Sequence, residues 1–173
     1  MRLFIFTSLV VLTMSFGLYG QTEDINRSTS MVMPKVVEWR RHLHEFPELS
    51  NREFKTSKYI EEHLRKLGLE VRTGIAHTGV VGILKGAMPG PTIGLRADID
   101  GLPVTEKNGL PWASKETADF NGQKVGVMHA CGHDTHIAIL MGTAEVLAGM
   151  RNKIDRKSTR LNSSHEWISR MPS

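Results

Sequence analysis

Cysteine is almost absent from this chain of 173 residues, which contains only Cys131. A single cysteine excludes an intramolecular disulfide framework, and the lack of any cysteine pair excludes a zinc finger. The sequence also has no phosphate-binding glycine motif and no internal repeat, so nothing in it indicates a nucleotide-binding loop or a repeat architecture. The thiol of Cys131 is therefore expected to be buried, bound to a metal or reactive.

Charge of one sign is not concentrated anywhere in the body of the chain. The net charge is +4, but residues 155–173 account for much of it, with four basic residues against two acidic ones. No basic stripe with interleaved aromatic residues is present, so the sequence predicts no nucleic-acid partner. The apolar fraction of 40% is enough for the core of one domain.

Long apolar runs are confined to the beginning of the chain. One arginine precedes an almost wholly apolar run over residues 3–12, and polar sequence begins at residue 21. This layout is typical of a secretory signal peptide, so we predict a leader at 1–20, a polar linker at 21–33, and a secreted or periplasmic protein. An uncleaved membrane anchor is the alternative, although the run barely reaches the length of a spanning helix.

The body of the chain alternates helical and strand patterns, which predicts an α/β fold. A first helix is expected from Pro34 to Phe46, and a second is expected to follow a capping box at 50–53 and end at Gly68. Apolar runs bounded by glycine and proline predict strands at residues 69–72, 80–84 and 92–98.

The second half of the body has two further parts. Residues 101–124 are expected to form a long irregular segment, anchored by Trp112 and Phe120, and such segments are usually functional or flexible. A strongly periodic helix is predicted to follow, from Asp134 as its N-cap to about Arg151.

Directly before that helix, three histidines, an aspartate and the only cysteine fall within residues 127–136. In an extended backbone His129, Cys131 and His133 would point to one side, and the N-terminus of the following helix would favour the thiolate. These residue types predict an open, catalytic metal site that residues elsewhere complete. The alternative is a buried structural cysteine with ordinary histidines, and His136 is expected to face solvent.

A second group of candidate residues ends the third predicted strand. Asp98 and Asp100 lie where the strand gives way to Gly101. In an open α/β sheet, carboxylates at the carboxyl end of a strand are where sites are built. A simple turn is the alternative, because aspartate and glycine both favour turns.

Four segments in order resemble one known family. They read Arg-His-Leu-His-Glu-Phe-Pro-Glu-Leu-Ser at 41–50, Thr-Gly-Val-Val-Gly at 78–82, Gly-Leu-Arg-Ala-Asp-Ile-Asp-Gly-Leu-Pro-Val at 94–104 and Met-His-Ala-Cys-Gly-His-Asp at 128–134. The chain resembles the N-acyl-amino-acid amidohydrolases over about residues 34–154. That family includes hippurate hydrolase and the indole-acetyl-amino-acid hydrolases, and it belongs to the metallopeptidase clan of aminoacylases and glutamate carboxypeptidase.

The resemblance implies a metal-dependent amidohydrolase that cleaves the amide of N-acyl amino acids. It implies part of a three-layer αβα zinc-peptidase-type catalytic domain with two divalent ions, Zn²⁺ or Mn²⁺. Cys131 and His133 match metal ligands, and Asp98 matches an aspartate that supports the site. Asp100, His129 and Asp134 are placed beside the ligands. The substrate would be a small N-acyl amino acid or a short peptide, and the full-length protein would be a homodimer.

The chain departs from the family at two places. Gly101 stands where the family usually has alanine, which is a small difference. From residue 155 the sequence is polar and serine-rich, and we expect 155–173 to be an unrelated, artefactual tail without strand character, a genuine disordered tail being the alternative. The adjacent glutamates that supply the family's general base and a further metal ligand would then be missing.

Three functional hypotheses remain open at this point. The first is a truncated amidohydrolase that is inactive alone because it lacks the general base. The second is a non-catalytic remnant that binds one ion through His129, Cys131 and His133. The third is a dipeptidase or carboxypeptidase of the same clan.

Overall fold

The structure is a computed structural model that describes residues 3–88, 90–154 and 159–162. Its helices are α1 (Leu3–Glu45), α2 (Phe54–Lys66), α3 (His133–Gly149) and the short 3-10 helix η1 (Arg151–Lys153). Its strands are β1 (Glu70–Ile75), β2 (Gly79–Leu84), β3 (Gly94–Arg96), β4 (Thr117–Phe120), β5 (Gln123–Gly126) and β6 (Thr159–Asn162). Helices and strands are mixed along the chain, as the α/β prediction requires.

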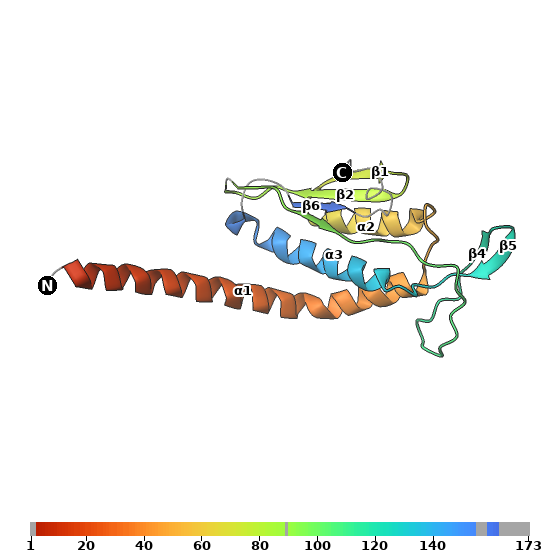
Figure 1. Cartoon of the computed structure of the whole chain (residues 1–173), viewed down its shortest axis with the longest axis horizontal. Coiled ribbons are helices and arrows are strands. Elements are labelled where there is room, and N and C mark those ends of the chain that lie inside the picture. Colours follow the sequence, from red (N-terminus) through yellow and green to blue (C-terminus); the bar gives the residue numbers. More distant parts are fainter. Residues whose placement is uncertain (1–2, 89, 155–158, 163–173) are drawn as a thin grey trace, which may run out of the picture.

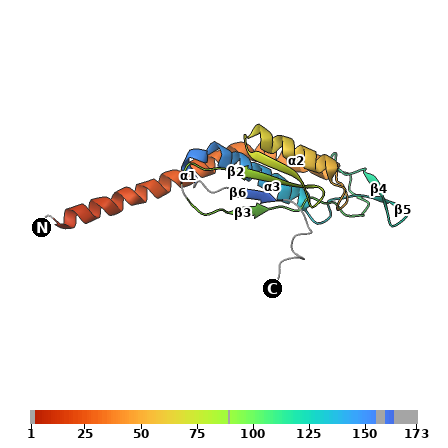
Figure 2. The ribbon, with the colours of Figure 1, turned by 90° about the horizontal axis from the view of Figure 1, so that it is seen from above.

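Helix α1 is much longer than predicted. Residues 21–33, expected to be a linker, are helical, and the helix continues through Pro34. A proline inside a helix costs about 3 kcal/mol or more, so packing must hold the helix together on both sides of it. Val32 and Val36 provide that packing, because both are buried and lie against Gly142 of α3. The N-terminal part of α1 extends away from the rest of the molecule (Figure 1, Figure 2).

No helix in the described ranges combines the length and the apolar character that crossing a membrane requires.

The main sheet has four strands in the order β1-β2-β6-β3. Strands β1 and β2 form an antiparallel hairpin. Strand β6 pairs antiparallel with β2 and parallel with β3, with Gly94 opposite Arg160. The prediction that the tail lacks strand character is therefore wrong for residues 159–162, where the gap between β2 and β3 offers hydrogen-bond partners on both sides. The rest of the tail lies outside the described residues.

Helices α2 and α3 cover one face of this sheet. Ile60 and Leu64 of α2, Val80 of β2, and Ile137 and Met141 of α3 share one buried core. Helix α3 lies between α1 and the sheet (Figure 1). The first residue of α3 is thereby held at the edge of the core, next to the segment that follows β3.

The start of α2 differs from the predicted capping box. Glu53 occupies the N-cap position but makes no capping hydrogen bond with its side chain. Glu48 does this instead, because its Oε2 accepts from the backbone N–H of Thr56 at 2.8 Å and from the Thr56 hydroxyl at 3.0 Å. The Glu53 carboxylate accepts a hydrogen bond of 2.6 Å from the hydroxyl of Thr78. Two buried or half-buried carboxylates thus fix α2 to its neighbours.

The segment 101–124 is only partly irregular. It contains β4 and the start of β5, which form a separate two-stranded antiparallel sheet. Asn121 and Gly122 join them with φ angles of 50° and 76°, as in a two-residue hairpin turn. Trp112 anchors the segment, since the guanidinium of Arg41 lies 4.1 Å from its ring centre. The prediction that Phe120 is a second anchor is wrong, because 40% of that residue is exposed.

The contact between α1 and α3 depends on the small size of Gly142. A Cβ atom at this position would lie 2.6 Å from Cγ2 of Val36, which is closer than two carbon atoms can approach. Valine is stiff about χ1, so Val36 cannot easily move aside. We expect Gly142→Val to destabilise the fold by about 1–3 kcal/mol through overpacking.

Urea unfolding of the variant and the wild type measures this difference. Gly149→Ala is the matched control, because nothing lies within 4 Å of a Cβ at that position. It should leave the free energy of unfolding unchanged or slightly raise it. If the two substitutions change the free energy of unfolding equally, Gly142 is not tightly packed between α1 and α3.

His63 of α2 is a titratable group within the packed helices. Its Nε2 lies 3.1 Å from the carbonyl oxygen of Met141 in α3, so this nitrogen must donate, and Trp39 of α1 contacts its ring edge. Burial lowers the pKa of His63 from its ordinary value of 6.5. The folded chain therefore favours neutral His63, whereas the unfolded chain gains a proton below about pH 6.5.

We predict from this shift that acid weakens the fold. The contribution of neutral His63 to the free energy of unfolding is fully present above pH 6.5. It falls as the pH drops from 6.5 toward the lower pKa that His63 has in the folded state. His63→Gln keeps a donor for Met141 but cannot gain a proton. Denaturant unfolding at neutral and mildly acidic pH should show a smaller loss for His63→Gln than for the wild type, and an equal loss would contradict the assignment.

Candidate functional site

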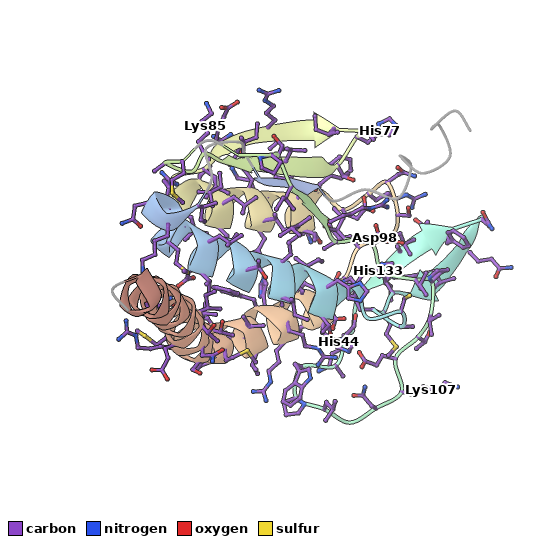
Figure 3. All side chains as sticks on the ribbon, turned by 60° about the vertical axis from the view of Figure 1, so that its left-hand side comes forward. His44, His77, Lys85, Asp98, Lys107 and His133 are labelled. Atoms are coloured by element: carbon purple, nitrogen blue, oxygen red, sulfur yellow. The ribbon has the colours of Figure 1, made fainter. Side chains whose placement is uncertain are left out.

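The two aspartates after β3 have different surroundings. Asp98 forms an ion pair with Arg96, whose Nη2 lies 2.6 Å from its Oδ1. Asp100 is buried and faces the start of α3, where its Oδ1 lies 3.0 Å from Nδ1 of His133. The strand end therefore does reach the histidine-rich segment, through Asp100. Figure 3 labels Asp98 beyond the end of β3, His133 at the start of α3 and His44 near the end of α1.

The contacts of His133 select one tautomer of its neutral ring. Its Nδ1 lies 3.1 Å from the backbone oxygen of Asp100 as well as 3.0 Å from the carboxylate. A carbonyl oxygen only accepts hydrogen bonds, so Nδ1 carries a proton and Nε2 of the neutral ring carries the lone pair. A histidine held in this way by a carboxylate presents Nε2 as a metal ligand.

Gly132 makes this placement of His133 possible. It is the N-cap residue of α3 and has a φ of +91°, which a residue with a side chain rarely adopts. The prediction that Asp134 is the N-cap is thus wrong, because the turn at Gly132 starts the helix at His133. Asp134 lies in the first turn, where the helix dipole still favours a negative charge.

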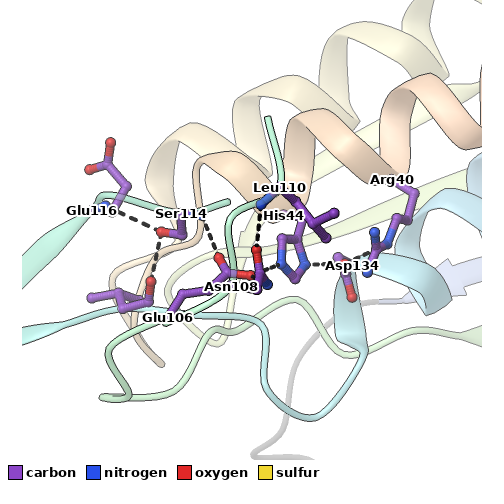
Figure 4. A network of polar contacts seen from close by, with 9 residues as sticks. Arg40, His44, Glu106, Asn108, Leu110, Ser114, Glu116 and Asp134 are labelled. Carbon is purple, nitrogen blue, oxygen red and sulfur yellow. Dashed lines mark hydrogen bonds and ion pairs between the residues drawn. The ribbon is translucent and has the colours of Figure 1, made fainter. Parts of the chain in front are cut away.

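Asp134 is fully buried, and two side chains of α1 contact its carboxylate. Its Oδ2 lies 2.9 Å from Nε of Arg40 and 2.8 Å from Nδ1 of His44. Its Oδ1 has no hydrogen-bond partner among the described residues. Asp134 therefore fixes the first turn of α3 to the last turns of α1, as Figure 4 shows.

The contacts continue from His44 to the segment after the strand end. Nε2 of His44 lies 2.8 Å from Oε1 of Glu106, whose side chain is 1% exposed. The backbone N–H of Ser114 and the amide of Asn108 also donate to Glu106 (Figure 4). Burial alone would raise the pKa of Glu106, but the hydrogen bonds from His44 and Ser114 outweigh it and hold that pKa below its ordinary value.

The remaining residues of the histidine-rich segment do not converge. His129 is buried, and neither of its ring nitrogens has a hydrogen-bond partner among the described residues. Burial lowers the pKa of His129 to about 4, so the ring is neutral at neutral pH. Cys131 is exposed, and so is His136, as predicted.

The expectation that His129, Cys131 and His133 face one side is therefore wrong. The backbone bends at Cys131 and Gly132 instead of staying extended, which exposes the thiol between two buried rings. Within the described ranges, no three histidine, cysteine, aspartate or glutamate side chains lie close enough to enclose a metal ion. Cys131 and the lone pair of His133 have the donor chemistry for part of a metal site, and a third ligand must come from elsewhere.

Three residues of this region were not predicted from the sequence, namely Arg40, His44 and Glu106. His44 lies inside the first family-like segment, 41–50, so a signal for it was present. Glu106 lies just beyond the third segment, in a stretch without periodicity. Only the folded chain shows that Arg40 and His44 contact Asp134 and that His44 also contacts Glu106.

Comparison with known proteins supports the predicted resemblance. Residues 94–162 match the model of "Peptidase family M20/M25/M40", a range that includes β6. The chain is 50% identical over 132 residues to thermostable carboxypeptidase 1 of Saccharolobus solfataricus, with 76% of this chain and 31% of that protein covered. It is 42% identical over 132 residues to an N-acyl-L-amino acid amidohydrolase of Geobacillus stearothermophilus, covering 76% and 34%. The chain thus spans about a third of the length of these relatives.

Solved structures agree with the sequence matches. A Bacillus subtilis protein described as a dinuclear metal-binding peptidase of the M20 family superposes with a TM-score of 0.68 at 38% identity, covering 78% of this chain and 35% of that one. A putative aminohydrolase of Staphylococcus aureus gives 0.73 at 36% identity, covering 82% and 35%. The family resemblance and the fold class are therefore confirmed, and the chain is related in sequence and in fold to part of the peptidases and amidohydrolases of family M20/M25/M40.

Proposed function

We propose that this chain carries part of the metal centre of a hydrolase that cleaves the amide bond of N-acyl amino acids. The observation that carries the proposal is the fixed ring of His133. Asp100 holds its protonated Nδ1, and the exposed thiol of Cys131 lies two residues away on the turn that starts α3. Both are donors for Zn²⁺ or Mn²⁺, and the relatives named for amidohydrolase and metal-binding peptidase activity support the same chemistry.

In this proposal Cys131 and His133 hold a metal ion together with ligands outside the described residues. Bound metal ions would polarise the amide carbonyl and lower the pKa of a water molecule. Asp100 fixes the tautomer of His133, and Asp134 anchors the turn that bears it. Asp98, at the strand end, supports the site while it is paired with Arg96.

We propose that the general base of the reaction is supplied from outside the described residues. Glu145 lies three turns along α3 from His133 and pairs with Lys35 of α1 at 2.5 Å. Glu106 is engaged with His44 and Ser114. Glu166 is the only glutamate after α3 and lies outside the described residues. We therefore propose that the 173-residue chain alone does not hydrolyse amides.

The longer protein is proposed to be an exported homodimer whose further residues supply the base and the other metal ligands. A second candidate function is peptide hydrolysis at the carboxyl end, because the relative with 50% identity is named a carboxypeptidase. Assays of the longer protein with hippurate-like N-acyl amino acids and with short peptides separate the two. Release of an amino acid from peptides but not from N-acyl substrates would contradict the amidohydrolase proposal.

Metal binding by the chain itself is a direct test. We predict that Cys131→Ala and His133→Gln each weaken Zn²⁺ binding by at least about tenfold, because each removes a ligand. Asp100→Asn should weaken binding roughly 10–100-fold, since it releases the ring of His133. Calorimetric titration with Zn²⁺, supported by the absorption of Co²⁺ bound to thiolate, measures the affinities.

His136→Asn is the matched control for these substitutions. His136 lies on the next turn of α3 with its ring 5.9 Å from that of His133, but it is exposed. Its replacement should leave the affinity unchanged. If His136→Asn weakens binding as much as Cys131→Ala does, the assignment of the ligands is wrong.

A further inference from the structure

His44 joins three segments that meet at the candidate site. It lies in the last turn of α1, and its two ring nitrogens contact carboxylates from two other segments. Nδ1 is 2.8 Å from Oδ2 of Asp134 in the first turn of α3, and Nε2 is 2.8 Å from Oε1 of Glu106 in the segment after Asp100. Asp134 follows His133 in the sequence, and Asp100 is the hydrogen-bond partner of His133.

The charges in this group determine how it holds together. Ionised carboxylates only accept hydrogen bonds, so His44 serves both partners only when both of its nitrogens carry protons. Arg40 adds a further contact to the same group, with its Nε 2.9 Å from Oδ2 of Asp134. Removing one member of such a buried group leaves an uncompensated charge, which strongly destabilises the local arrangement.

The arrangement around His133 depends on both carboxylates. Asp134 sets where the first turn of α3 lies relative to α1, and Glu106 sets where the segment from Asp100 onward lies. The 3.0 Å contact between Asp100 and His133 bridges these same two segments. A change at His44 would therefore move the two sides of that contact independently.

We propose that His44 is a positioning residue for the metal ligand His133: it clamps Asp134 to Glu106 and thereby keeps Asp100 in contact with the ring of His133. The role in metal binding rests on the proposed function. The effect on the ring of His133 does not, because the clamp and the Asp100 contact are formed by the chain alone. A residue that only packed α1 against α3 would affect stability without affecting His133.

The test uses His44→Gln in the 173-residue chain labelled with ¹⁵N. Glutamine has a similar reach, but both of its N–H donors are on one nitrogen, so it cannot replace the two ring nitrogens that contact Asp134 and Glu106 from different sides of the ring. Correlation of the ring nitrogens with ring protons by NMR reports the tautomer of His133 without any metal. We expect the wild type to show Nδ1 protonated and His44→Gln to show a mixture of tautomers, with Zn²⁺ affinity lowered roughly 10–100-fold.

Two further variants make the result specific. His63→Gln is the matched control, because His63 is a partly buried histidine that also contacts α3, at Met141, but has no link to the site. It should leave the tautomer of His133 and the Zn²⁺ affinity unchanged. Glu106→Ala removes one partner of the clamp without altering α1, and it should shift His133 in the same direction as His44→Gln.

The outcomes separate the inference from the proposed function. If His44→Gln folds and keeps both the His133 tautomer and the affinity within about twofold of the wild type, the positioning role is refuted. If His44→Gln does not fold, Glu106→Ala decides, and an unchanged His133 ring in that variant refutes the role as well. If the wild type binds no Zn²⁺ but His44→Gln still mixes the tautomers, the clamp stands and the proposed metal function fails.

Discussion

The buried charge of Asp134 is the constraint on which the rest of the structure depends. A carboxylate without contact with water must be paired and hydrogen-bonded inside the protein, and here Arg40 of α1 supplies the opposite charge while His44 of α1 supplies a second polar contact. This fixes the rotation of α1 about its own axis, because only one face of the helix carries those two side chains, one turn apart. The apolar contact of Val32 and Val36 with α3 continues from the same face of the helix. The polar contacts and the apolar contacts between α1 and α3 therefore lie on the same face of α1.

The same constraint explains why the candidate metal ligand His133 lies in the first turn of a helix, with Cys131 on the bend directly before it. His133 is the residue next to Asp134, so it inherits the rigidity of the first turn of α3 while Gly132 supplies the bend that exposes Cys131. Ligands on rigid elements are held more accurately than ligands on mobile segments. The chain spans about a third of its relatives, and its described residues present two metal donors and the groups that orient them.

The sequence predicted most helices and strands that have a local pattern, with the β4–β5 hairpin as an exception. It did not predict the features that depend on partners far away in the chain. The periodicity of α3 and the apolar run of β2 predicted both to within a few residues, and the strand-end pattern singled out Asp100, which does contact His133. The extension of α1 through Pro34 was missed because a proline in a polar stretch ordinarily starts a helix, and only burial against α3 reverses this. The β4–β5 hairpin was missed although Asn121-Gly122 is a strong local turn signal. His44 and Glu106 could not be found from spacing, since 62 residues separate them.

Strand β3 has one hydrogen-bonded neighbour in the described sheet, and that neighbour is β6, more than sixty residues further along the chain. The hairpin of β1 and β2 closes as soon as both strands exist, whereas β3 must wait until α3 and the residues after it have been synthesised. During translation its N–H and C=O groups are an open edge that other strands could join. In the described sheet β3 is therefore paired only after β6 has been synthesised, although the chain continues from β3 directly into Asp98 and Asp100.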